Sequence, residues 1–594
     1  MREHWAKLGE PSKTEGKEET KSKAEQIVGH VSRRDFLKRA VPVIAGVGLA
    51  GALGIDPSFA SSASPAAAPP APGTQLSTAS YVIYHQNNFY VQNGTTGRID
   101  YSGPDAATVI QPAINALFDG GLIVLRRGIY PLTNTLLVGQ GIHLVGERGA
   151  VIRVADGSQN SANPFNMIEV AGDGATIEGI ELDGNASSNP NLAGTTLYPA
   201  PANPDMQSGV VVHAGRNVKI LDCHIHDIWN AGIWLRAIDT IEGTEISGCR
   251  LESTGVSHAD PSTTNRPQSA NAIYVLRQST STSKARIHNN FIKDTFGRGI
   301  YLHFDSDSIV SDNVIVNSRS CSTETAGIVL DDFIQRTIVK GNQISGYAPG
   351  IYLVWRGCEN VIIEGNSCTN APNGGGTGMG ILLLNNVAGA PISKGIVVKG
   401  NICKGNALAG IQVAASNVIV EGNICYSNNC DSSDIATRKS GILVQGVPDV
   451  SVDGVLIIGN RCFDDQDVQT QQYGISLSQQ NDVVSQVLIS NNDLRGNGMD
   501  SIGALDAQSF RLHSNTGYNP LGLDLINVGP VSPFTYVNDD GVSEAIYITG
   551  GAVSDISKNN ESIFASSPAT ILLDPSDTLT ITHTDPPRVL KDRR

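Results

Sequence analysis

Four titratable residues that lie within a short stretch of the chain could perform acid–base chemistry. Asp331 and Asp332 are adjacent, and His303 and Asp305 come shortly before them. Neighbouring residues of a strand point to opposite faces, so both carboxylates of the pair reach solvent only where the strand passes into a turn. Carboxylates that lie close together raise one another's pKa, which favours a general acid beside an ionised partner. We therefore predict glycoside hydrolysis, with Asp331 or Asp332 as the acid, Asp305 as the base or nucleophile, and His303 tuning either group.

Aromatic and charged side chains recur around these residues in a pattern that suits sugar binding. Aromatic faces stack on the apolar faces of sugar rings, and Arg, Asp and His side chains supply hydrogen bonds. An extended polysaccharide is therefore the predicted partner. The predicted binding residues are Trp234, Arg236, Tyr274, Arg277, Tyr301, Tyr352, Trp355 and Arg356. The alternative interpretation is that these aromatic residues are ordinary strand formers and that the charges form a solvated face.

A repeated tetrapeptide indicates the elements that position these side chains. Copies of Gly-Ile-x-Leu begin at Gly232, Gly299, Gly327, Gly350, Gly380 and Gly474. A second apolar alternation follows each copy and is marked by an Asn with an apolar residue two positions later, as in Asn342 and Ile344. The units recur every 22 to 37 residues or so, a range typical of solenoids. We predict an all-β parallel β-helix in which the Ile and Leu point inward, x points outward, and the Asn side chains form a ladder at a bend.

This pattern resembles the pectate-lyase and polygalacturonase superfamily of right-handed parallel β-helices, over roughly Leu122 to Asn515. The segment from Asp105 to Tyr130 resembles the opening of such chains. The resemblance implies a right-handed solenoid and leaves the activity open, because one architecture hosts many functions. Polygalacturonase-like hydrolases also carry an Asp pair on this scaffold. Their Asn-Thr-Asp, Gly-His-Gly and Arg-Ile-Lys motifs are absent at matching positions, which argues against a pectin-specific enzyme.

A second activity that the resemblance implies is a Ca²⁺-dependent polysaccharide lyase. Ca²⁺ bound by Asp305, Asp307 and Asp331 would acidify the proton next to a uronate carboxylate. Arg277 or Arg356 would then abstract that proton, as in a pectate-lyase mechanism. The hydrolase needs no cofactor, so Ca²⁺ is expected only if the protein is a lyase.

Two further alternatives use the same surface. Uronate C5-epimerases on this fold combine Tyr, His and Asp, and Tyr301, His303 and Asp331 supply these types in a different local order. A surface or tailspike-like adhesin would hold the glycan without cleaving it. Such an adhesin would tolerate the loss of Asp331 or Asp332.

The cysteines and one histidine pair have structural interpretations. Four of the nine cysteines occupy positions that Ile fills in other units, which predicts stacked, buried thiols rather than zinc ligands or disulfides: Cys368, Cys403, Cys425 and Cys462. Cys223 and Cys249 fall in the Asn column instead. We expect His224-Ile225-His226 to lie in a turn and not to bind a metal.

Composition and the N-terminal part of the fold agree with a β solenoid. Charged residues make up 17% of the chain and aromatic residues 5%, and the 63 glycines suit a turn-rich β protein. The formal net charge of -15 argues against a nucleic-acid partner. An amphipathic helix from Asp105 to Leu117, with Asp105 as its N-cap, is predicted to cover the first coil, although Pro112 could kink it.

The chain divides into five predicted regions. Residues 1–60 resemble a twin-arginine signal peptide, because Arg33 and Arg34 precede an uncharged run, residues 40–55, that is too short for a stable membrane span. We therefore expect export by the twin-arginine route, with a secreted or cell-surface location. A flexible linker (61–80), an N-terminal cap with the first strands (81–150), the right-handed β-helix (151–518) and a small C-terminal β module (519–594) follow. The sequence carries no indication of oligomeric state.

Overall fold

The computed structural model describes residues 79–593 except for 160–163, 190–206, 238–239, 257–269, 278–282, 320–324, 374–375, 386–392, 432–438, 449, 480–481, 519–522, 540 and 542. The described residues all belong to one compact unit, residues 74–594. The predicted signal peptide, and the predicted linker up to residue 78, lie outside the described residues. Among the helices that are described, none is long and apolar enough to cross a membrane.

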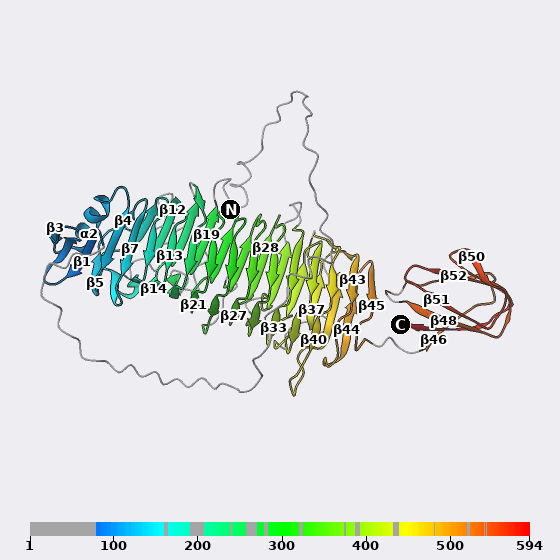
Figure 1. Cartoon of the computed structure of the whole chain (residues 1–594). Coiled ribbons are helices and arrows are strands. Elements are labelled where there is room, and N and C mark those ends of the chain that lie inside the picture. Colours follow the sequence, from blue (N-terminus) through cyan, green and yellow to red (C-terminus); the bar gives the residue numbers. More distant parts are fainter. Residues whose placement is uncertain are drawn as a thin grey trace, which may run out of the picture. The chain divides into compact units, whose positions relative to one another are not determined.

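Three parallel sheets form the wall of a solenoid, and each typical coil contributes one strand to each sheet (Figure 1). The parallel part of sheet A extends from β1 (Tyr81–His85) to β45 (Phe510–His513), and the antiparallel strands β2 (Phe89–Asn93) and β3 (Ile99–Gly103) continue that sheet beyond β1. Sheet B extends from β5 (Gly128–Leu132) to β40 (Arg461–Phe463), and sheet C from β6 (Leu136–Val138) to β44 (Asp500–Leu505). This arrangement confirms the predicted all-β parallel β-helix. The central coils contribute to sheet C the strands β12 (Val210–Arg216), β15 (Ile233–Ala237), β19 (Ile273–Arg277), β22 (Ile300–His303), β25 (Ile328–Asp331), β28 (Ile351–Trp355) and β31 (Ile381–Asn385).

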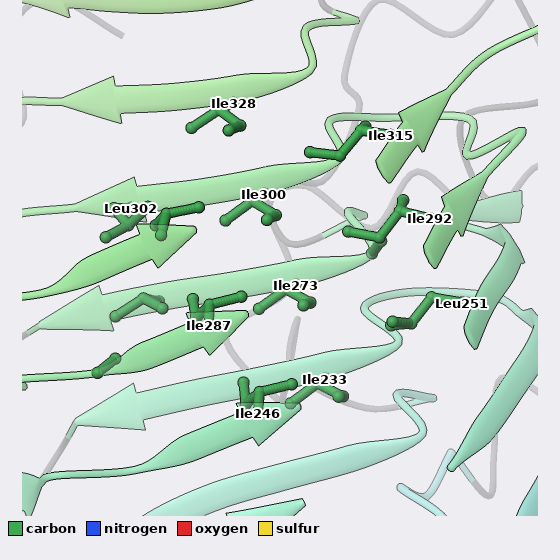
Figure 2. Close-up of a cluster of buried hydrophobic side chains, with 14 of the residues drawn as sticks. Ile233, Ile246, Leu251, Ile273, Ile287, Ile292, Ile300, Leu302, Ile315 and Ile328 are labelled. Atoms are coloured by element: carbon green, nitrogen blue, oxygen red, sulfur yellow. The ribbon is translucent and has the colours of Figure 1, made fainter. Parts of the chain in front are cut away.

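The interior is filled by aligned columns of aliphatic side chains, several of which Figure 2 shows. The Ile of the tetrapeptide is in register from coil to coil, so that Ile273 lies beside Ile300 and Ile300 beside Ile328. All three are fully buried. Burying one such side chain contributes roughly 1.5–3 kcal/mol, and no coil could bury its own column without neighbours.

Asparagines form the predicted ladder at the bend between sheets A and B. Asn342 lies between β26 (Ile338–Lys340) and β27 (Gln343–Ser345). Its Nδ2 donates to Asn366 Oδ1 at 2.9 Å, and its own Oδ1 accepts from Asn313 Nδ2 at 2.9 Å. The backbone N–H of each Asn also donates to the next side chain, as from Asn342 to Asn366 at 3.0 Å. Each rung therefore satisfies buried turn groups of its own coil and of a neighbour.

The four cysteines predicted to stack do so, and we call them the cysteine column. They continue the column of Ile344, in register from coil to coil, and are fully buried: Cys368, Cys403, Cys425 and Cys462. Every cysteine that the structure describes is a free thiol. Cys249 lies at the Asn-ladder position, where its N–H donates to Asn290 Oδ1 at 3.0 Å.

The predicted N-terminal helix is α2 (Ala106–Asn115). The Asp105 side chain caps it by accepting a hydrogen bond from the Thr108 N–H at 2.8 Å. The helix contains Pro112 and ends at Asn115, two residues before the predicted end. Its apolar face packs on β2, β3, β5 and β6, so that it covers the first coil.

The C-terminal residues form two four-stranded antiparallel sheets with a core of their own. One sheet has the order β46 (Leu523–Ile526), β53 (Arg588–Arg593), β48 (Glu544–Thr549) and β51 (Ala569–Leu573). The other has the order β47 (Phe534–Val537), β52 (Thr578–Asp585), β49 (Ala552–Lys558) and β50 (Glu561–Phe564). Both sheets lie within residues 519–594, the region in which the sequence predicts a small β module.

Candidate active site

Adjacent strands of sheet C bring three titratable side chains together at their C-terminal ends. His303 ends β22, Asp331 ends β25, and the two residues are paired in register. Asp332 follows with a φ of 48°, in the left-handed region, so the chain leaves strand geometry there. One ligand-type atom of each of His303, Asp331 and Asp332 lies within 4.8 Å of the others. Both aspartates therefore lie where a strand passes into a turn, as the sequence predicts.

Asp331 lies at the floor of this group and has the environment of a general acid. The Tyr301 hydroxyl donates to its Oδ2 at 2.5 Å, whereas its buried Oδ1 has no hydrogen-bond partner. Burial raises the pKa of Asp331, against the lowering effects of the His303 charge and the Tyr301 hydrogen bond. Burial also raises the pKa of Tyr301, which keeps the phenol protonated. A general acid must be protonated before it can donate a proton. Asp331 lies in the least polar part of the group, where burial favours its protonated, neutral form. We call Tyr301, His303, Asp331 and Asp332 the acid–base cluster.

Asp332 lies nearer the surface, beside a histidine and an arginine. Its Oδ2 is 3.7 Å from His303 Nε2, and its Oδ1 is 3.2 Å from Arg356 Nε. His303 Nδ1 lies 3.5 Å from the Tyr274 hydroxyl. The two adjacent aspartates thus occupy different environments, one among buried groups and one in an ion-paired network, which is the separation that acid and base roles require.

The aromatic residues of the predicted sugar platform stack on one another and are covered. Ring centroids are 5.5 Å apart for Trp234 and Tyr274, and 4.9 Å apart for Tyr274 and Tyr301. Only 1–2% of the surface of each of these three residues is exposed. The prediction of an open stacking platform is therefore wrong for them. They form an apolar cluster on the outside of sheet C, separate from the interior core, that supports the acid–base cluster.

The remaining predicted binding residues differ in exposure. Trp355, at the end of β28, is 46% exposed, and Arg356 is also open to solvent. Tyr352 is half-buried, and burial raises its pKa to about 12. Arg236 places its guanidinium carbon 5.6 Å from the Trp234 ring centroid. Of the predicted binding residues, therefore, Trp355 and Arg356 offer the most accessible surface.

The Arg277 side chain lies outside the described residues, although the residue itself ends β19. A lyase role for Arg277 stays a prediction.

The predicted role of Asp305 is corrected by the structure. Phe304 has a φ of 57°, and this left-handed residue breaks the strand alternation that the sequence argument assumed. The β-bridge from Ser306 to Gln335 aligns Asp305 with the buried Ile334, and Asp305 itself is 0% exposed. Its Oδ1 accepts a hydrogen bond from the Ser283 hydroxyl. Asp305 thus faces the interior and is not a base or nucleophile on the outer surface.

The predicted Ca²⁺ site is not formed by the residues that the structure describes. Asp305 faces inward, and Asp307 receives two hydrogen bonds from Arg336, at 2.6 Å and 2.9 Å. The group that meets Asp331 is His303 and Asp332 instead. One histidine and two aspartates fit the many-oxygen preference of Ca²⁺ poorly, so we derive no step through Ca²⁺.

Sequence reasoning missed two features of this face. Arg298, just before Gly299, places its guanidinium carbon 4.5 Å from the Tyr301 ring centroid and lowers the pKa of Asp331. A hollow of about 320 Å³ lies over the coils that follow, and apolar side chains including Leu382, Leu408 and Leu443 line it together with Gln412. The residues that line the hollow are neither aromatic nor ionisable, so the sequence pattern that predicts sugar binding does not include them.

The comparisons with known proteins bear on the fold. Residues 208–394 match a family model described as a right handed beta helix region, and this segment contains the whole acid–base cluster. The chain is a right-handed parallel β-helix protein. The handedness that the superfamily resemblance implied is thereby confirmed. The comparison with curated proteins gave no match.

Several solved structures share this fold at low identity. The A-module of the mannuronan C-5 epimerase AlgE6 from Azotobacter vinelandii is 16% identical with a TM-score of 0.36, and the alignment covers 70% of this β-helix protein and 96% of that chain. The Dettilon tailspike protein gp208 is 15% identical with a TM-score of 0.48, covering 82% and 91%. The periplasmic alginate epimerase AlgG is 15% identical with a TM-score of 0.36, covering 66% and 76%. At such values the likeness carries no argument about activity.

Proposed function

We propose that this β-helix protein is an exported polysaccharide-active enzyme, and that the acid–base cluster cleaves a glycan bound along the outside of sheet C. The observation that carries the proposal is the contrast between two adjacent carboxylates. Burial raises the pKa of Asp331, while Asp332 pairs with His303 and Arg356. A glycoside hydrolase uses two carboxyl groups whose surroundings favour different protonation states, one neutral and one ionised.

In this mechanism the protonated Asp331 donates its proton to the glycosidic oxygen as the bond from the anomeric carbon to that oxygen breaks. Asp332 attacks the anomeric carbon at the same time, because carboxylate oxygens within 4.8 Å of each other fit the closer spacing of a nucleophilic mechanism better than the wider spacing of direct water attack. A water molecule then adds its hydroxyl to the anomeric carbon, which releases Asp332 as a carboxylate, and its remaining proton returns to Asp331. The Tyr301 hydrogen bond orients Asp331. Arg356 and the exposed Trp355 would hold sugar units beside the cleaved bond. The proposed enzyme needs no cofactor.

A second candidate is favoured by one specific observation. Strand register brings Tyr301, His303 and Asp331 together, although their order in the sequence did not predict it. Arg298 lies over the Tyr301 ring and Arg356 beside Asp332, so two guanidinium groups flank these residues and could bind a uronate carboxylate. A base could then remove the C5 proton. Expulsion of the C4 oxygen would complete a lyase reaction, and return of a proton to the other face would complete an epimerase reaction.

The test is an incubation of the full chain with a panel of neutral and uronate polysaccharides. Reducing ends, absorbance at 235 nm and the C5 configuration of the product, read by NMR, are followed together. New reducing ends without absorbance support the hydrolase. Absorbance supports a lyase and overturns hydrolysis, and a changed C5 configuration without cleavage supports an epimerase. Glycan binding without any reaction makes the protein an adhesin and overturns the enzyme proposal.

Matched variants tie the reaction to the cluster. Asp331→Asn and Asp332→Asn are expected to lower turnover by about 100-fold or more, since acid–base groups contribute roughly 10²–10⁴-fold. Asp493→Asn is the control, because Asp493 also pairs with a guanidinium, that of Arg495 at 2.8 Å, but on the part of the wall that continues sheet B. Equal activity of the two cluster variants and the control would contradict the assignment.

A further inference from the structure

A second group of titratable side chains lies on sheet B, outside the acid–base cluster. Strand β11 (Glu181–Asp183) pairs in parallel with β14 (His224–Ile228), which places Glu181 opposite His224 and Asp183 opposite His226. Side chains that alternate along a strand share a face, so Glu181, His224 and His226 all project from the outer surface of the sheet. The expectation that the two histidines lie in a turn is wrong, because they belong to a regular strand.

The three side chains converge closely. One ligand-type atom of each lies within 4.8 Å of the others. His226 Nε2 is 3.3 Å from Glu181 Oε1, and the two imidazole centroids are 4.6 Å apart. Two imidazoles and one carboxylate are the ligand types that Zn²⁺ and related divalent transition ions prefer. The residues come from two adjacent coils, so an ion held between them would also link those coils.

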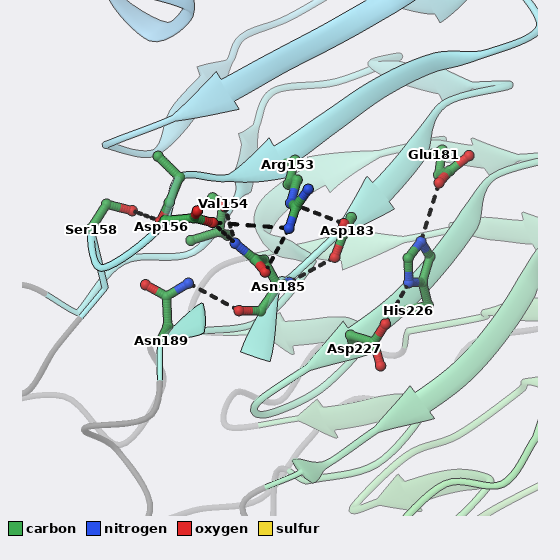
Figure 3. Close-up of polar contacts among 11 residues, drawn as sticks. Arg153, Val154, Asp156, Ser158, Glu181, Asp183, Asn185, Asn189, His226 and Asp227 are labelled. Carbon is green, nitrogen blue, oxygen red and sulfur yellow. Dashed lines mark hydrogen bonds and ion pairs between the residues drawn. The ribbon is translucent and has the colours of Figure 1, made fainter. Parts of the chain in front are cut away.

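His226 has the support that a metal-binding histidine needs. Its Nδ1 lies 2.9 Å from Asp227 Oδ2. Figure 3 marks this contact with a dashed line. A carboxylate on one ring nitrogen fixes the tautomer and leaves the other nitrogen, here Nε2, facing Glu181.

Two neighbouring carboxylates are paired with guanidinium groups, whereas Glu181 has no such partner among the described residues. Asp183 is 3.3 Å from Arg153 Nε (Figure 3), and Glu252 is 2.9 Å from Arg250 NH2 and also 3.3 Å from His224 Nε2. Among the described residues, the Glu181 carboxylate contacts His226 alone. A metal ion would therefore displace no guanidinium from Glu181.

Space for further ligands adjoins the group. A hollow of about 220 Å³ is lined by His224, His226, Asp227 and Glu252, together with Lys293 and Asp294. Three protein ligands beside an open hollow leave a coordination position for water or a small anion. This distinguishes the arrangement from a closed four-ligand structural site.

From these observations we propose that Glu181, His224 and His226 form a binding site for one divalent transition-metal ion, with Zn²⁺ as the expected occupant and an open coordination position facing the hollow. The proposal is independent of the acid–base cluster, which lies on a different sheet.

The test is a titration of the chelator-treated full chain with Zn²⁺, in competition with a chromophoric chelator, for the wild type and four variants. Wild type is expected to bind one Zn²⁺ tightly. His226→Gln, His224→Gln and Glu181→Gln should each weaken binding by at least 10-fold. His288→Gln, the control, should leave it unchanged. His288 ends β20 (Arg286–His288) and also faces a glutamate, Glu245 at 3.3 Å, but it belongs to no three-residue ligand group among the described residues.

Two further readouts keep the proposal falsifiable if a variant fails to fold. Co²⁺ bound to the wild type should give visible bands of a nitrogen and oxygen site without a thiolate charge-transfer band. Asp227→Asn, which keeps all three ligands, should weaken Zn²⁺ binding by roughly 10–100-fold because the imidazole loses its orienting carboxylate. A thiolate band, absence of Zn²⁺ binding by wild type at micromolar concentration, or equal loss in His288→Gln would overturn the proposal.

Discussion

Replacement of one rung of the asparagine ladder, Asn366→Ala, should destabilise the β-helix strongly. The Asn366 side chain makes four hydrogen bonds. Nδ2 donates to the Val339 carbonyl and to Asn401 Oδ1, both at 3.0 Å, and Oδ1 accepts from the backbone N–H and the Nδ2 of Asn342, at 3.0 Å and 2.9 Å. A hydrogen bond contributes about 1 kcal/mol net, and a buried group left without a partner costs about 1–3 kcal/mol. The expected loss in the free energy of unfolding is therefore about 4 kcal/mol.

The loss is measured by urea unfolding followed by circular dichroism, with amide hydrogen exchange to locate it. Asn417→Ala is the matched control, since Asn417 is an exposed asparagine with a φ of 53°. Its replacement should cost only about 1 kcal/mol, mainly because alanine tolerates the left-handed region poorly. Amides of the coils beside Asn366 should lose protection in the ladder variant alone. Equal losses in the two variants would refute the idea that the ladder stabilises the stack.

Four other outcomes follow from the structure and the sequence. The raised pKa of Asp331 means that the neutral carboxyl stabilises the fold at low pH and that this contribution is lost as pH rises through the folded pKa. In urea unfolding, Asp331→Asn should therefore gain stability over wild type at neutral pH, and the gain should vanish below about pH 3.9. Tyr301→Phe removes a hydrogen bond that lowers the pKa of Asp331, so the alkaline limb of the pH–activity profile should move to higher pH. When the folded protein is labelled with a disulfide reagent, the exposed Cys430 should react and the buried cysteine column should not. The Cys430→Ser variant should lose the label that Cys430 accepts. Exchange of Arg33 and Arg34 for Lys should leave the precursor inside the cell in an export assay, and normal export would refute the twin-arginine prediction.

The columns of the solenoid could be predicted because they depend on alternation alone. Every strand has a side-chain period of two, and stacking repeats that period from coil to coil. Ile300 and Ile328 therefore lie in one interior column, and Asn342 and Asn366 in one ladder, as the sequence indicates. The Asp331–Asp332 pair was also placed correctly, because the residue after an inward Leu faces outward and its position allows the strand to pass into a turn there.

The predictions of side-chain orientation and exposure were wrong where the backbone leaves strand geometry, or where the burial of a side chain depends on other segments of the chain. A single left-handed residue, Phe304, turned Asp305 from the outer face to the interior, and no count of alternating positions reveals such a residue. Trp234 and Tyr274 do point outward, but their burial is decided by what packs over sheet C. Arg298 was missed because it precedes the repeated tetrapeptide, and only strand register brings its guanidinium over Tyr301.

The most direct test of the central claim is a crystal structure of Asp332→Asn with an oligosaccharide taken from a polysaccharide that the wild type cleaves. The account predicts a sugar lying over His303 and Arg356, with its glycosidic oxygen within about 2.6–3.2 Å of an Asp331 oxygen. A sugar bound elsewhere, in the apolar hollow beyond Leu382 or on sheet B, with Asp331 still covered, would contradict the assignment of the acid–base cluster as the catalytic site.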